Sequence, residues 1–272
     1  GSEMCIRDSW NPVWPSHGIR ILPGPSSLWL DATGKRLPVP LFPGFDTLGT
    51  LAHLRSTGHD HSWFVTSRQI VEKEFALSGS EQNPDLTGKD VGLLVKSRLA
   101  KGPTGPVQAF LDEGEDFIVE NDLESLLEQM QRHPGGESLD IDHVRREVIA
   151  RDLEMENEFT KDTQIGMLRS MRGYRGDKLI RTAAPHRLQD PAAGPLVAVK
   201  LHVLTRKSLG GINTDLDGRA LGADGEPIPG LYAAGEASGF GGGGVHGYRA
   251  LEGTFLGGCL FSGRQAGRAA AR

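Results

Sequence analysis

GLYAAGE, at residues 230–236, is followed directly by ASGFGGGGVHGYRALEGT, at residues 237–254, and this stretch decides how the fold is interpreted. The apolar run from Leu231 to Ala234 is bounded by glycines and predicts a short buried strand. Open α/β sheets bind ligands beyond the carboxyl ends of their strands, which is where Glu236 stands. A lone carboxylate there can accept hydrogen bonds from the hydroxyls of a sugar chain, so Glu236 is the first candidate ligand-binding residue.

The segment after this strand has six glycines among the nine residues from Gly239 to Gly247. Because glycine has no side chain, its backbone can approach a flat ring or a phosphate closely and can adopt positive φ. A flexible loop is the alternative interpretation. Gly239, Gly241 and Gly244 match a dinucleotide fingerprint, but no helix opens at once and no acid follows about twenty residues later. We therefore assign no Rossmann phosphate loop here.

A helix is predicted from about Gly253 and Thr254 to Arg272. The free N–H groups at its start can stabilise negative charge that develops on a bound ligand. The helix contains several small residues, which predict close packing against backbone or ligand, although core packing explains them equally well. The basic end at Arg272 suits a helix C-terminus.

These motifs resemble the C-terminal FAD-binding segment of the succinate dehydrogenase, fumarate reductase and 3-ketosteroid dehydrogenase superfamily. The resemblance includes the closing Gly263-Arg264-x-Ala266-Gly267 and, upstream, residues 207–215. GVHGYRALEGT, at residues 244–254, is most similar to the proteins called FAD-binding dehydrogenases, and residues 28–36 and 62–65 are similar to strands that link their FAD and substrate domains. The resemblance implies FAD as cofactor, with these binding residues: Ala234, Gly235, Glu236, Gly244, Gly253, Thr254, Phe255 and Leu256.

The same resemblance implies catalytic residues, which are Tyr248, Arg249 and His246. His246, Tyr248 and Thr254 match the spacing found in ketosteroid dehydrogenases, where the tyrosine hydrogen-bonds a substrate carbonyl and favours enolisation. A packed aromatic ring with a satisfied hydroxyl is the alternative for Tyr248. Arg249 suits bidentate binding of a carboxylate, but an i,i+3 contact with Glu252 explains it equally well.

A fumarate reductase is a poorer match, because the family's arginine falls one position later, at Ala250, and its histidine before the glycine pair is replaced by Lys207. The predicted function is that of an FAD-dependent oxidoreductase, a dehydrogenase that transfers hydride between a small organic, ketosteroid-like substrate and FAD. Two alternatives stay open: a fumarate-reductase-like enzyme acting on an unsaturated dicarboxylate, and a non-catalytic flavin-fold fragment.

The predicted fold class is α/β, a discontinuous FAD-binding Rossmann-like domain with an inserted, mostly helical substrate or cap domain. We expect the FAD domain to be N-terminally truncated, because no strand, glycine loop and helix for the ADP half of FAD precede Trp10. Residues 1–9 resemble a translated sequencing adapter and are predicted to be a non-native leader. Residues 10–90 are predicted to be the strand-rich part of the FAD and substrate domains, residues 91–190 the helical cap, and residues 191–272 the C-terminal part of the FAD domain.

Two helices of the predicted cap can be placed by their starts. Asn121-Asp-Leu-Glu124 offers a capping box before a helix, and Asp140 or Asp142 opens a second one. The apolar residues that these helices are expected to carry are Leu123, Leu126, Leu127 and Met130 in the first, and Val144, Val148 and Ile149 in the second. From Pro195 the chain returns to a strand over residues 196–204.

Composition limits the partners. The net charge of −5 gives no nucleic-acid signature, and no apolar run is long enough for a membrane span. Two cysteines make no disulfide framework, which suits a reducing, cytoplasmic location. The expected partners are a small-molecule substrate and an unidentified electron donor or acceptor.

Two polar clusters are further candidate sites. His59-Asp60-His61 lacks a further spaced ligand set, so no metal is predicted. Arg181, His186 and Arg187 either close over an anionic substrate or form a solvated hinge.

Overall fold

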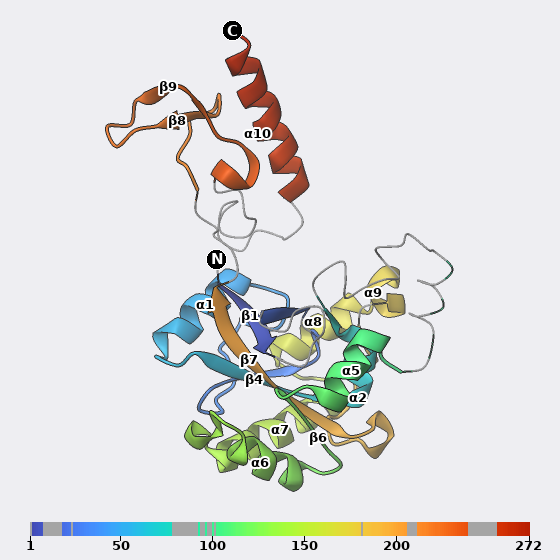
Figure 1. The fold of residues 1–272 in the computed structure, drawn as a ribbon. Helices are drawn as coiled ribbons and strands as arrows, with labels where there is room; N and C mark the ends of the chain where they lie inside the picture. Colours follow the sequence, from blue (N-terminus) through green and yellow to red (C-terminus); the bar gives the residue numbers. More distant parts are fainter. Residues whose placement is uncertain are drawn as a thin grey trace. The chain divides into compact units, whose positions relative to one another are not determined.

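The computed structural model describes residues 2–7, 18–22, 24–77, 92, 96, 100, 102–180, 182–205, 211–238 and 255–272 (Figure 1). By residue contacts they form two compact units. The larger unit contains residues 4–46 and 50–204, and the smaller unit consists mainly of residues 205–272.

The larger unit is built on a seven-stranded sheet in the order β3-β4-β7-β1-β2-β5, with β6 also pairing with β7. Strand β4 is antiparallel to β3 on one side and to β7 on the other. The strands predicted around residues 28–31, 62–65 and 196–204 are thereby confirmed. Their bounds are β1 Ser2–Arg7, β2 Gly18–Leu22, β3 Leu28–Asp31, β4 His61–Ser67, β5 Ala76–Leu77, β6 Phe117–Glu120 and β7 Leu196–Thr205.

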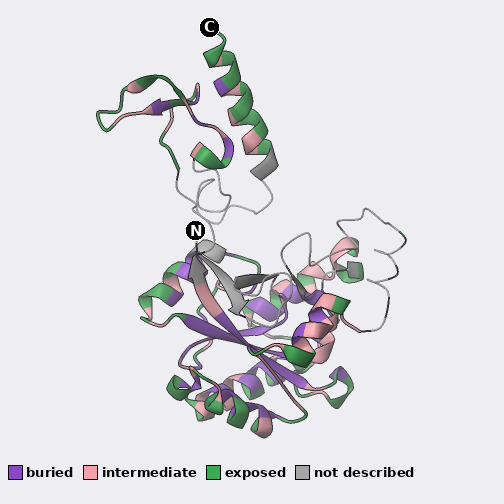
Figure 2. Ribbon diagram, in the orientation of Figure 1, coloured by how far each residue is buried: buried purple, intermediate pink, exposed green. Residues whose placement is uncertain are grey.

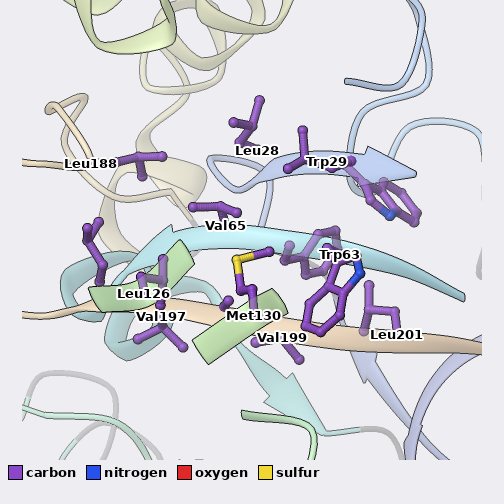
Figure 3. Packing of buried hydrophobic residues seen from close by; sticks show 14 of the residues in the cluster. Leu28, Trp29, Trp63, Val65, Leu126, Met130, Leu188, Val197, Val199 and Leu201 are labelled. Carbon is purple, nitrogen blue, oxygen red and sulfur yellow. The ribbon is translucent and has the colours of Figure 1, made fainter. Parts of the chain in front are cut away.

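The core of this unit lies around β4, whose seven residues are all buried. Trp63 and Phe64 point to opposite faces because side chains alternate along a strand, so both faces must be covered by apolar groups. Figure 3 shows Trp63 beside Met130 of a helix and beside apolar residues of β7. On the other face Trp29 meets Phe64 edge-on at 5.0 Å and donates its ring N–H to Ser62 Oγ at 3.0 Å.

The two helices predicted from their caps are present. Helix α6 (Leu123–Arg132) begins after Asp122, whose carboxylate accepts from the Ser125 N–H, so the cap stands one residue after the predicted Asn121. Helix α7 (Ile141–Glu156) begins after Asp140, one of the two predicted starts, and the Asp140 side chain accepts from the His143 N–H. Apolar positions of both helices reach the core, but Ile149 is exposed, which corrects its expected burial.

Further helices complete the larger unit. They are α1 Thr47–Ser56, α2 Arg68–Glu74, α5 Gly105–Glu113, α8 Thr163–Met171 and α9 Arg175–Ile180, with 3-10 turns η1 Gly136–Ser138 and η2 Pro191–Ala193. The middle of the chain is therefore mostly helical, yet its β6 strand shares the sheet of β4 and β7. Contacts divide the chain near residue 205, and the functional domain boundaries proposed from sequence stay a prediction.

The smaller unit has a hairpin of β8 (Arg219–Leu221) and β9 (Pro227–Tyr232), the 3-10 turn η3 (Gly235–Ser238) and helix α10 (Phe255–Ala270). The C-terminal helix is thus confirmed within the described residues. The prediction of a buried strand at Leu231 is wrong: β9 is mostly exposed, with Leu231 at 43% (Figure 2). The short β8 is its only pairing partner among the described residues, so little covers it.

Among the described helices, none combines the length and the apolar character that crossing a membrane requires.

The packing around β4 predicts the effect of a core truncation. Leu126→Ala should lower the free energy of unfolding by about 2–5 kcal/mol, because the side chain is fully buried and leaves a cavity. Leu153→Ala, on the exposed side of α7, should change it by less than about 0.5 kcal/mol. Urea unfolding of both variants measures this. Equal effects would contradict the assigned core.

Candidate functional site

The segment from Ala233 to Ser238 directly follows β9 and includes the 3-10 turn η3. It is fixed to neighbouring loops on both sides: the Ala233 N–H donates to Gly218 O at 2.9 Å, and the Ile212 N–H donates to Ala237 O at 2.9 Å. These backbone bonds place the carboxyl end of β9 in one defined conformation.

Gly235 is the residue at which the turn approaches α10. Its φ is +61°, a left-handed conformation that favours glycine. A Cβ added there would stand 3.2 Å from Cys259 Sγ, tighter than an ordinary contact. The Gly235 N–H donates to Ser262 Oγ and the Gly235 carbonyl accepts from Ser238 Oγ, both at 2.9 Å. The left-handed conformation therefore favours glycine, and any larger residue would also have to displace the Cys259 side chain slightly.

Glu236 follows directly and carries the one long side chain of the turn. It is exposed, and its carboxylate has no hydrogen-bond or ion-pair partner among the described residues. The other residues from 233 to 238 are Ala, Gly or Ser, so a ligand can come close to the backbone. The turn therefore offers an exposed carboxylate with no partner in the described part of the chain, and little steric hindrance around it.

Ala234, Gly235 and Glu236 are thus brought together in this turn. Phe255 and Leu256 begin helix α10, whose backbone is described there. The remaining predicted site residues lie outside the described residues: Gly244, His246, Tyr248, Arg249, Gly253 and Thr254.

The contact of Ser262, in α10, with the turn was not predicted from the sequence. From the sequence, Ser262 is one of the small residues of the C-terminal helix, which predict close packing only. Its hydrogen bond to Gly235 spans 27 positions, and no local sequence pattern signals such a contact.

The larger unit contains a buried ionic network. The carboxylate of Glu74 accepts from Ser26 N–H at 2.9 Å, from Ser26 Oγ at 2.7 Å and from Ala183 N–H at 2.7 Å. Burial raises the pKa of Glu74 despite these hydrogen bonds. Burial also disfavours the charged form of the Arg151 guanidinium, and this lowers its pKa to about 10.

Arg151 and Asp152 extend this network to the chain after α9. Arg151 donates to Ser26 O at 3.0 Å and pairs with Asp152 at 3.2 Å. Asp152 also accepts from Leu188 N–H at 2.6 Å and from Gln189 N–H at 3.0 Å. The network therefore joins the segment before β3 to α2, α7 and residues 183–189.

His186 and Arg187, from the predicted basic cluster, both have partners. His186 Nδ1 lies 2.7 Å from Ala184 O, which can only accept, so that nitrogen carries the proton. Ser67 Oγ, at 2.8 Å, then donates to Nε2. Burial lowers the pKa of His186. Arg187 pairs with Glu156 at 3.2 Å, whereas Arg181 lies outside the described residues.

His61, from the His59-Asp60-His61 segment, has both ring nitrogens hydrogen-bonded. Nδ1 lies 3.0 Å from Asp60 Oδ1 and Nε2 lies 3.0 Å from Gly135 O. Across the part of the chain that the structure describes, no three potential metal ligands are grouped.

Residues 8–256 match the FAD binding domain family, so this chain belongs to that family. FAD is the cofactor that the family binds, and the Gly235–Glu236 turn fits it. Over 263 residues, 97% of this chain, it is 65% identical to a KsdD-like steroid dehydrogenase of Mycobacterium tuberculosis and covers 46% of that protein. A KsdD-like steroid dehydrogenase of Mycolicibacterium smegmatis is 62% identical over 91% of this chain, which covers 45% of it.

The chain thus spans less than half the length of these curated relatives. Among solved structures it resembles a 3-ketosteroid delta1-dehydrogenase from Sterolibacterium denitrificans, which was determined in complex with 1,4-androstadiene-3,17-dione. The TM-score is 0.61 and the identity 18%, over 99% of this chain and 43% of that one. This likeness concerns the fold, a mixture of helices and sheet.

The neutral, Ser67-bonded state of His186 predicts an acid-dependent loss of stability. The unfolded chain takes up a proton at His186 near pH 6.5, whereas the folded chain does so only at a lower pH. The free energy of unfolding should therefore fall as the pH drops below about 6.5, down to the lowered pKa.

Urea unfolding between about pH 7.5 and about pH 5 measures this dependence. His186→Gln should reduce the slope, and His53→Gln in α1 is the matched control that should leave it unchanged. An undiminished slope in His186→Gln would show that His186 does not titrate in this way.

Proposed function

We propose that this chain is part of an FAD-dependent dehydrogenase that acts on a ketosteroid-like substrate. The observation that carries the proposal is the Gly235–Glu236 turn, in which small residues surround an exposed carboxylate that has no partner among the described residues, in a chain of the FAD binding domain family. The names of its relatives, which are KsdD-like steroid dehydrogenases, support the substrate class.

In this proposal Glu236 accepts hydrogen bonds from hydroxyls of the FAD sugar chain, and Ala234 and Gly235 allow the cofactor to approach. The further cofactor-binding residues are Gly244, Gly253, Thr254, Phe255 and Leu256. When bound, FAD supplies the hydride acceptor, while the protein supplies orientation and electrostatics. We assign the catalytic residues by resemblance as Tyr248, Arg249 and His246, with Tyr248 hydrogen-bonding the substrate carbonyl.

The proposed FAD domain is Rossmann-like and discontinuous, and it needs further protein surface to cover it. Support comes from the smaller unit, whose buried apolar side chains among the described residues are small: Ala220, Ala233 and Ala266. Leu216, Leu260 and Phe261 are exposed there at 94%, 65% and 62%. Exposed apolar groups of this kind mark surfaces that another part of a protein covers.

FAD binding is compared in two proteins. The first is this chain. The second, called the full-length hybrid, is the Mycobacterium tuberculosis relative in which this chain replaces the matching part. In a flavin fluorescence titration the hybrid should bind FAD, whereas the chain alone should bind it weakly or not at all. A hybrid that folds without binding FAD would contradict the proposal.

Within the full-length hybrid, Glu236→Gln should raise the Kd for FAD about tenfold, because a charge-assisted hydrogen bond to a hydroxyl is replaced by a neutral one. Glu226→Gln, an exposed residue of the hairpin loop, is the matched control and should leave the Kd unchanged. An unaltered Kd in Glu236→Gln would remove this residue from the cofactor site.

Tyr248→Phe in the same hybrid should lower kcat for a 3-ketosteroid about 100-fold or more, because the group that stabilises the developing enolate is lost. FAD binding should be retained. Anaerobic bleaching of the flavin absorbance after mixing with the steroid measures the reduction. A rate equal to that of the unsubstituted hybrid would mean that Tyr248 is a packed aromatic residue only.

A further inference from the structure

Ser262 of α10 lies at the point where the helix touches the candidate cofactor turn. We propose that Ser262 is a positioning residue: it fixes the Gly235 peptide so that Glu236 presents its carboxylate to the hydroxyls of FAD. This inference rests on the proposed function, since it takes Glu236 as a ligand of the cofactor.

The Ser262 hydroxyl takes part in two hydrogen bonds, one as donor and one as acceptor. It donates to Gly258 O, one helical turn earlier, at 2.7 Å, and it accepts from the Gly235 N–H at 2.9 Å. A hydroxyl has one proton to donate and two lone pairs to accept with, so both bonds are compatible. Together they connect the backbone of the turn to the backbone of the helix.

The two peptide groups that flank Gly235 are both held by serines. Ser262 accepts from the N–H before its Cα, and Ser238 donates to the carbonyl after it. Glycine has an unusually wide range of φ and ψ, so its own conformational preference does not hold it at φ +61°, and these two hydrogen bonds help to do so. The direction of the next residue, Glu236, is thereby fixed.

Glu236 depends on this backbone more than a typical ligand residue does. Its exposed carboxylate has no partner among the described residues, so no side-chain contact there orients it before FAD binds. Within the helix itself the serine is not needed, because a serine that bonds back to the carbonyl four residues earlier slightly destabilises a helix. The hydroxyl therefore acts on the turn.

The test is a double-mutant cycle in the full-length hybrid with Ser262→Ala, Glu236→Gln and the double variant. Ser262→Ala should raise the Kd for FAD about tenfold, the effect of losing one partly buried hydrogen bond. The double variant should bind FAD no more weakly than Glu236→Gln alone, because both substitutions remove the same interaction. Flavin fluorescence gives the Kd, and the melting temperature of the apoprotein reports any loss of stability.

A second pair of variants isolates the hydroxyl. Ser262→Thr keeps the hydroxyl and should bind FAD almost as tightly as the unsubstituted hybrid. Valine has nearly the same shape as threonine but no hydroxyl, so Ser262→Val should bind FAD as weakly as Ser262→Ala. Ser56→Ala is the control, because that hydroxyl also bonds a local carbonyl, His53 O at 2.6 Å, but at the end of α1. This control should leave the Kd unchanged.

The outcomes distinguish the two proposals. If Glu236→Gln weakens FAD binding but Ser262→Ala does not, or if their effects add, the positioning role is wrong and the proposed function stands. Equal binding by Ser262→Thr and Ser262→Val would also overturn it. If Glu236→Gln leaves the Kd unaltered, the assignment of Glu236 fails first, and the role of Ser262 through it fails as well.

Discussion

The larger unit depends on the pairing of strand β4 with β3 on one side and β7 on the other. Because all seven residues of β4 are buried, its two faces require two separate sets of apolar partners. Met130 of α6 supplies part of one set, and Trp29 of β3 supplies part of the other. The helices are therefore located by the strand that they cover, and segments separated by more than 100 residues meet around it.

Polar groups complete this unit where apolar packing ends. Glu74 and Arg151 are both buried, and neither is left without hydrogen bonds. Removing one partner of such a network leaves a buried charge uncompensated, which is strongly destabilising. The Glu74 carboxylate consequently joins Ser26, before β3, to Ala183, after α9. Nearby, Ser67 hydrogen-bonds His186.

The smaller unit is organised by its backbone. Its interior among the described residues consists of glycine and alanine contacts, and its turn is fixed by the hydrogen bonds of Gly235. Such an arrangement gives little stability by burial, and it leaves the Glu236 carboxylate exposed on a turn of small residues.

Local signals in the sequence were sufficient for several elements. The sequence limits the start of α7 to Asp140 or Asp142, because a carboxylate can satisfy a nearby N–H, and the structure selects Asp140; the apolar run at residues 196–204 predicts a strand. Glu236 was selected by its place after a strand, and the family match supports FAD. The exposure of Leu231 was not predictable in this way, because burial depends on which neighbours cover a strand. Ser262 and the Glu74–Arg151 network depend on contacts between distant segments, which periodicity and composition do not contain.

The central claim is that FAD contacts the turn at Gly235 and Glu236. Hydrogen–deuterium exchange of the full-length hybrid, with and without FAD, tests it most directly. The account predicts that FAD slows exchange at the amides of Glu236 and Ala237, while the amides of α7 serve as an unaffected reference. Slower exchange elsewhere with unchanged exchange at residues 235–238 would contradict the claim, because the cofactor would then bind without touching this turn.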